Sequence, residues 1–98
     1  MPTSPNILLL VTDQLSAQAL RAYGNTWSRT PAIDRLLASG VRFEHAYTPC
    51  PLCQPARAAF WTGLLPHQTR VLSNGRLDPV PTLPDTIPTL GSVFADRG

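Results

Sequence analysis

The chain contains one apolar run that does not alternate with polar residues. Residues 6–12 read Asn-Ile-Leu-Leu-Leu-Val-Thr. Such a run is typical of a central strand in a parallel sheet that is covered on both faces. It leads directly into Asp13 and Gln14, and the carboxyl ends of parallel strands face the ligand crevice in open α/β sheets. Position alone leaves two roles for Asp13, contact with a metal or substrate and capping of a following helix.

The pattern then predicts a helix followed by a second strand. Thr30 and Pro31 are typical of an N-cap and a first helical residue, and Gly40 is typical of a helix end. Residues 41–47 alternate between apolar and polar, which indicates a half-buried strand. His45 lies on the apolar side of that strand, where a core histidine is the more common reading than a ligand.

Beyond residue 72 the chain changes character. Residues 72–88 are rich in Pro, Asn, Gly, Asp and Thr, which predicts a long surface loop. A last helix is predicted from about Pro88 to Arg97. The alternation of strand and helix indicates an α/β fold whose sheet is incomplete, because a right-handed parallel crossover needs another strand after this helix.

Composition narrows the function classes. The 98 residues are 43% hydrophobic and only 14% charged, which suits part of a larger domain. The net charge of +2 comes from scattered arginines without any lysine, so a nucleic-acid partner is not expected. The longest apolar run, Ile7 to Val11, has five residues and no basic stretch before it. We therefore expect no signal peptide, no membrane partner and a cytoplasmic location.

A short helix is predicted from Pro55 to Thr62, because proline favours the first turn and Gly63 is a natural terminator. Cys53 would lie just outside its N-terminus, where unpaired N–H groups stabilise a thiolate or an anionic substrate. Arg57 is four residues after Cys53, so its planar cation can reach the same point and hold an oxyanion. The spacing fits a buried loop cysteine beside a surface arginine equally well.

The C-x-x-C spacing of Cys50 and Cys53 leaves two further alternatives, half a zinc site or a redox pair. Zinc is poorly supported because there is no second C-x-x-C, and neither His45 nor His67 has a partner at ligand spacing. Redox chemistry is poorly supported because the predicted helix follows both cysteines, whereas in the thioredoxin pattern the attacking cysteine opens the helix.

Cys53-Gln-Pro-Ala-Arg57, followed by Trp61-Thr-Gly63, resembles the C-x-P-x-R signature of type I sulfatases. Further segments resemble the same family in the same order: Pro5 to Asp13, Tyr23 to Asn25, Thr30 to Leu37, Gly40 to Phe43, Pro66-His67, Asn74-Gly75 and Pro88 to Leu90. The resemblance implies the alkaline-phosphatase-like superfamily, an α/β sandwich with a mainly parallel central sheet flanked by helices. Residues 1–98 are expected to be the N-terminal portion of its catalytic domain.

The resemblance also implies a sulfuric ester hydrolase that acts on a small-molecule sulfate ester. Cys53 would be converted after translation to formylglycine by a formylglycine-generating enzyme, and Cys50 would be a bystander. In the hydrated aldehyde, one hydroxyl attacks sulfur and the other lets the carbon expel sulfate by re-forming the aldehyde. Arg57 would hold the hydrate and offset its negative charge. Asn74 is a candidate for contacting substrate oxygens.

The resemblance further implies a divalent metal held by Asp13, Gln14 and the group derived from Cys53. Calcium is the expected ion, with magnesium or manganese as alternatives. Many sulfatases have a second aspartate at the position of Gln14, and glutamine resembles the phosphonate and phosphodiester hydrolases of the same superfamily. Those hydrolases are therefore one alternative function, and a non-catalytic remnant is another. We expect the 98 residues alone to be inactive, because family members are several times longer and place further metal ligands, a lysine and a histidine in later segments.

Overall fold

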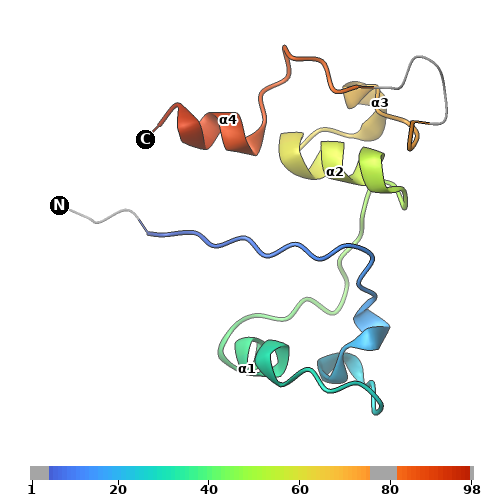
Figure 1. The fold of residues 1–98 in the computed structure, drawn as a ribbon, viewed down its shortest axis with the longest axis vertical. Helices are drawn as coiled ribbons and strands as arrows, with labels where there is room; N and C mark the ends of the chain where they lie inside the picture. Colours follow the sequence, from blue (N-terminus) through green and yellow to red (C-terminus); the bar gives the residue numbers. More distant parts are fainter. Residues whose placement is uncertain (1–4, 76–81, 98) are drawn as a thin grey trace. The chain divides into compact units, whose positions relative to one another are not determined.

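The computed structural model describes residues 5–75 and 82–97 and divides into two compact units, Met1–Glu44 and His45–Gly98. The first contains the 3-10 helices η1 (Ala17–Ala19) and η2 (Arg21–Tyr23) and the helix α1 (Pro31–Ser39). The second contains the helices α2 (Cys53–Thr62), α3 (Pro66–Thr69) and α4 (Leu90–Ala95) (Figure 1).

Polar contacts hold the helical part of the first unit together. The Tyr23 hydroxyl donates to the Phe43 carbonyl at 2.8 Å, and the Arg42 guanidinium lies 5.2 Å from the centre of the Tyr23 ring. Arg42 also donates to the Ala22 carbonyl and pairs with Glu44. The segment after α1 is thereby attached to η2, in a unit that has no buried side chain in its helices.

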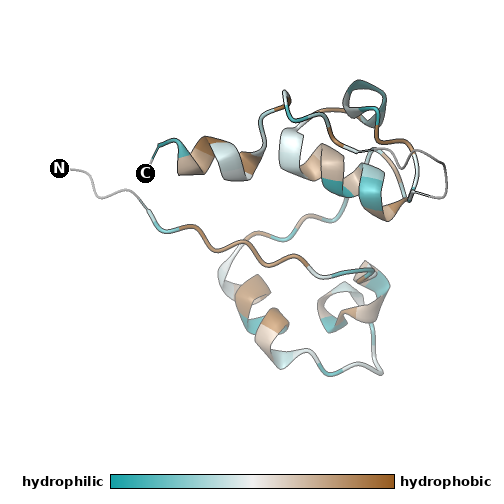
Figure 2. Ribbon diagram, turned by 45° about the horizontal axis from the view of Figure 1, so that its top comes forward, coloured by the Kyte–Doolittle hydropathy of each residue, from teal (hydrophilic) through white to brown (hydrophobic). Residues whose placement is uncertain are grey.

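The predicted strands require correction. Within residues 5–75 and 82–97 no strand is formed, so the strands predicted for 6–12 and 41–47, and the parallel sheet, are not shown by the structure. Residues 6–12 form an extended apolar stretch (Figure 2), but a strand needs a neighbouring backbone to pair its N–H and C=O groups. The apolar side chains of this stretch are accordingly 48–82% exposed, from Leu9 at the low end to Leu8 at the high end.

The helix α1 confirms the prediction for its region. Thr30 is its N-cap, Pro31 its first residue and Gly40 its C-cap. The Thr30 hydroxyl accepts a hydrogen bond from the Arg21 N–H at 3.4 Å and donates to Asp34 at 3.2 Å. Thr30 therefore ties the start of α1 to η2 as well as opening the helix.

The core of the second unit lies between α2 and α3. Its buried side chains are Pro55, Ala58, Ala59, Thr69 and Val71. Small residues on α2 let the short helix α3 approach closely, since little side-chain volume separates the two backbones. The reversal between them depends on Gly63, whose φ of 72° is left-handed and whose N–H bonds to the Ala59 carbonyl at 2.8 Å.

Two helices begin at residues other than the predicted ones. The helix expected from Pro55 begins at Cys53, because Leu52 acts as N-cap and accepts the first helical bond from the Ala56 N–H at 2.9 Å. Pro55 is tolerated in the first turn, where N–H groups have no helical partner. The helix expected from about Pro88 begins at Leu90, behind a capping box formed by Thr89 and Ser92.

The predicted loop at 72–88 is described only in part. Residues 82–88 contain neither helix nor strand, and 76–81 lie outside the described residues. Among the helices of the described ranges, none combines the length and the hydrophobicity needed to cross a bilayer.

The exposed apolar stretch generates a prediction about association. Burying one large apolar side chain stabilises a fold by roughly 1.5–3 kcal/mol. Because Ile7 to Val11 are exposed, the stabilisation that their burial would give is absent, and it is comparable with the roughly 5–15 kcal/mol that stabilises a typical domain. The 98-residue chain expressed alone should therefore self-associate in sedimentation velocity experiments. Replacing the most exposed leucines, Leu8→Lys with Leu10→Lys, should shift it toward monomer. A monodisperse, cooperatively melting wild-type monomer would contradict this prediction.

Candidate active site

The helix α2 carries two of the predicted site residues on one face. Cys53 is its first residue and Arg57 lies four positions later, so both side chains project from the same side of the helix. Both are exposed, whereas Pro55, Ala58 and Ala59 are buried. The packing of the buried face thus fixes which side of α2 offers a cysteine and a guanidinium to a ligand.

The first turn of α2 has an unusual capping arrangement. Its N-cap is Leu52, whose side chain cannot accept a hydrogen bond. The Gln54 N–H instead donates to the side-chain oxygen of Asn74 at 3.0 Å. Asn74 comes from a turn 20 residues later in the chain, next to Gly75 with its left-handed φ of 74°. The structure therefore brings Asn74 to the end of α2 that bears Cys53.

Sequence reasoning selected Asn74 but missed its bond to Gln54. The Asn-Gly pair signals a turn, yet no local pattern connects residues 20 positions apart. The sequence does contain one signal for this bond, the apolar N-cap Leu52. A helix that begins after leucine needs a capping oxygen from another segment.

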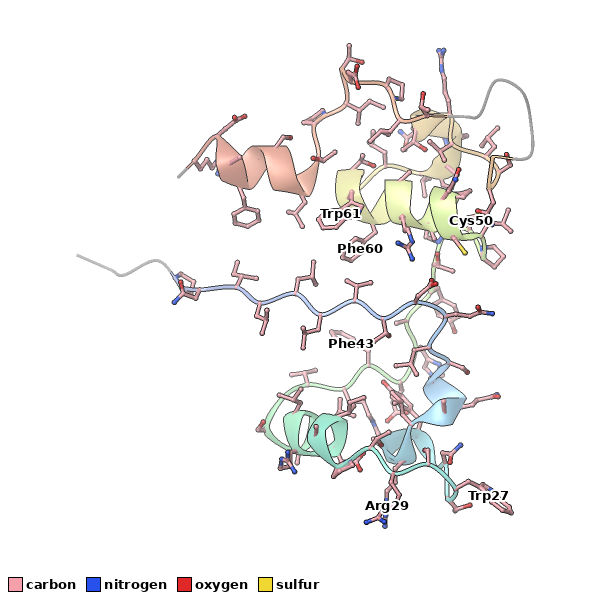
Figure 3. All side chains as sticks on the ribbon, in the orientation of Figure 1. Trp27, Arg29, Phe43, Cys50, Phe60 and Trp61 are labelled. Carbon is pink, nitrogen blue, oxygen red and sulfur yellow. The ribbon has the colours of Figure 1, made fainter. Side chains whose placement is uncertain are left out.

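Both thiols are free, with Cys53 exposed and Cys50 partly buried. Cys50 lies ahead of α2 (Figure 3), where the Thr48 hydroxyl donates to its carbonyl at 2.9 Å. Although the helix begins two residues earlier than predicted, Cys50 remains outside it. The order of the two cysteines relative to the helix therefore still differs from the thioredoxin pattern.

Asp13 and Gln14 belong to the first unit, where they form a bend directly after the extended apolar stretch. Gln14 has a φ of 53°, a left-handed conformation that costs a non-glycine residue roughly 1–2 kcal/mol. Such strain is common at functional sites. Both side chains are exposed, and their carboxylate and amide oxygens suit a hard divalent cation.

The metal prediction fits the donor chemistry of these two residues but is not complete in the described ranges. No group of three or more His, Cys, Asp or Glu side chains that could hold a metal ion occurs in residues 5–75 and 82–97. The expected ligand set of Asp13, Gln14 and the group at position 53 stays a prediction.

The family model for sulfatases matches residues 5–98. The chain belongs to the sulfatase family. It is 48% identical over 95 residues to the Delta 4,5-hexuronate-2-O-sulfatase of Bacteroides thetaiotaomicron. The matched region is 96% of this chain and 20% of that relative. It is also 44% identical over 96 residues to the arylsulfatase A of Bos taurus, covering 96% of this chain and 19% of the relative.

A solved structure agrees. The structure of a 2-O GAG sulfatase superimposes on this chain with a TM-score of 0.74 and 50% sequence identity. The match covers 83% of this chain and 18% of the chain of that sulfatase. The resemblance inferred from the sequence motifs is thereby confirmed, and the fold is that of a segment of a sulfatase. This chain spans about a fifth of the length of these curated relatives.

Proposed function

We propose that this segment supplies the nucleophile and its arginine to a sulfatase that hydrolyses small-molecule sulfate esters. The observation that carries the proposal is that Cys53 and Arg57 lie on the same exposed face of α2, in a chain of the sulfatase family. The 98 residues alone are expected to be inactive. A sequence match and a structure match are both named as 2-O-sulfatases, so a 2-O-sulfated hexuronate is the first substrate to assay.

Cys53 would act after conversion to formylglycine by a formylglycine-generating enzyme. The hydrated aldehyde would supply one hydroxyl for attack on sulfur, and loss of the proton from the other hydroxyl would re-form the aldehyde while the bond between carbon and the sulfated oxygen breaks and sulfate leaves. The position of Cys53 at the first residue of α2 supports this role, because the dipole of the helix places partial positive charge at that end. Arg57, one turn further on, would add a full charge and two parallel donors.

Asp13 and Gln14 would hold a divalent cation, with calcium the first choice for an oxygen-only ligand pair. When bound, the ion would polarise the sulfate group. Their bend follows the extended stretch 6–12, which we propose becomes a strand of a mainly parallel, helix-flanked sheet when neighbouring strands are present. A cytoplasmic location remains part of this proposal, on the sequence argument alone.

A second candidate activity is hydrolysis of phosphonate monoesters or phosphodiesters. The observation that favours it is Gln14, a neutral amide at a position where many sulfatases have aspartate. One carboxylate fewer leaves the metal site more positive, which changes its preference among oxyanions.

The proposed function is tested with the natural protein that carries these residues, coexpressed with a formylglycine-generating enzyme. We expect sulfate release from the sulfated hexuronate, measured by ion chromatography, to exceed phosphate release from matched phosphate and phosphonate esters. Cys53→Ala should abolish it and Cys50→Ala should leave it intact. Faster turnover of the phosphonate ester would favour the second candidate, whereas full activity of Cys53→Ala would contradict both.

Arg57 gives a prediction about charge and geometry. Arg57→Ala should lower kcat/KM by roughly 100-fold to 1000-fold, the usual effect of removing a donor that stabilises a developing oxyanion. Arg57→Lys should recover only part of it, since an ammonium keeps the charge but loses the planar fork. Arg70, outside α2, supplies the matched control as Arg70→Lys, which should leave kcat/KM unchanged. Equal activity of Arg57→Ala and wild type would rule out this role.

Gln14 gives a prediction about the metal. Gln14→Asp adds a carboxylate and should lower the calcium concentration needed for half-maximal activity after chelation and readdition. Asp13→Asn removes the only carboxylate of the pair and should raise it. Isothermal titration with calcium would check both shifts independently of turnover. The assignment fails if neither substitution alters calcium affinity.

A further inference from the structure

The first turn of α2 is capped from outside its own sequence. Leu52 provides no side-chain acceptor, and Pro55 has no N–H to offer. The first bond within the helix runs from the Ala56 N–H to the Leu52 carbonyl. In the part of the chain that the structure describes, the peptide that follows Cys53 is tied to a distant segment by the 3.0 Å hydrogen bond from the Gln54 N–H to the side chain of Asn74.

That contact acts on the backbone of the nucleophile. The Gln54 N–H and the Cys53 carbonyl belong to one planar peptide group, which is bonded directly to the Cα of Cys53. Holding the N–H fixes the plane, and the plane fixes the ψ angle of Cys53. The direction of the Cα–Cβ bond relative to α2 follows from that angle. The hydrogen bond thus restrains the side chain that would perform the attack.

Asn74 is itself held in place. In the segment just before it, Thr69 is fully buried and Val71 is only 4% exposed. The Thr69 hydroxyl also accepts from the Val71 N–H at 3.3 Å. The segment that leads to Asn74 is thus anchored in the core between α2 and α3, and Gly75 supplies the left-handed turn that follows.

The hydrogen bond also fixes the orientation of the Asn74 carboxamide. An N–H donor requires an acceptor, so Oδ1 faces the helix and the NH₂ group takes the other position. The part of Asn74 that contacts α2 is therefore the part that an aspartate would keep. This separates a role through the helix from a role through the amide protons.

We infer that Asn74 is a positioning residue, which orients the nucleophile at position 53 through the peptide of Gln54. The inference rests on the proposed function and deepens it. It assigns the side-chain oxygen to the helix, in place of the substrate contact that the sequence predicted for Asn74.

The test compares three variants of the natural protein, each matched for formylglycine content by peptide mass. Asn74→Ala should lower kcat at least about tenfold with little change in KM, because a misoriented nucleophile slows the chemical step. Asn74→Asp keeps the acceptor and should recover most of kcat, while its added charge raises KM for an anionic substrate. Thr89→Ala is the control, since the Thr89 hydroxyl caps α4 by accepting from the Ser92 N–H at 3.2 Å. It should lower the melting temperature without lowering kcat.

Two kinetic results would overturn the inference. One is a wild-type kcat in Asn74→Ala. The other is a kcat in Asn74→Asp as low as in Asn74→Ala with both proteins folded, which would assign the effect to the amide protons and a substrate contact.

Amide hydrogen exchange separates this inference from the proposed function. The Gln54 amide should exchange faster in Asn74→Ala than in wild type, and at the wild-type rate in Asn74→Asp and Thr89→Ala. This measurement needs no substrate, so it decides the matter even if wild-type protein releases no sulfate and the proposed function fails. Unchanged exchange at Gln54 in Asn74→Ala would overturn the inference.

Discussion

Burial of one face of α2 against α3 determines what the opposite face presents. Pro55, Ala58 and Ala59 are the positions that pack, and they cannot be buried without turning Cys53 and Arg57 outward. Cys53 and Arg57 therefore share a side of the helix as a consequence of packing, and no separate device is needed to bring them together. The site chemistry that we propose depends on this small core, whose side chains are few and short.

The second dependence is on the start of α2. An apolar N-cap leaves the first turn without a local acceptor, and the Asn74 side chain replaces it from a turn anchored by Thr69 and Val71. Helix, turn and nucleophile are in this way one connected unit. A change at Asn74 can alter the position of the group at Cys53 through the Gln54 peptide, without touching that group, which is the physical content of a positioning role.

The sequence predicted local features well where they depend on neighbouring residues. Thr30, Pro31 and Gly40 bound α1 as expected, and Gly63 ends α2 in the left-handed conformation that favours glycine. Features that depend on residues distant in the chain were not predicted from the sequence. The apolar run 6–12 has the composition of a buried strand, but without a paired backbone it remains an exposed extended stretch. Proline alone does not fix the start of α2, because the first turn of a helix accepts proline at several positions and Pro55 is the third helical residue. The site motif was predictable because Cys53 and Arg57 are close in sequence, whereas the Asn74 bond was not.

We propose above all that Cys53, as the first residue of α2, is the precursor of the catalytic group. The most direct measurement is the mass of the tryptic peptide that contains Cys53, from natural protein made beside a formylglycine-generating enzyme of confirmed activity. We expect the mass loss that accompanies conversion of a thiol to an aldehyde, located at Cys53 and absent at Cys50. An unmodified Cys53 thiol under those conditions would contradict it.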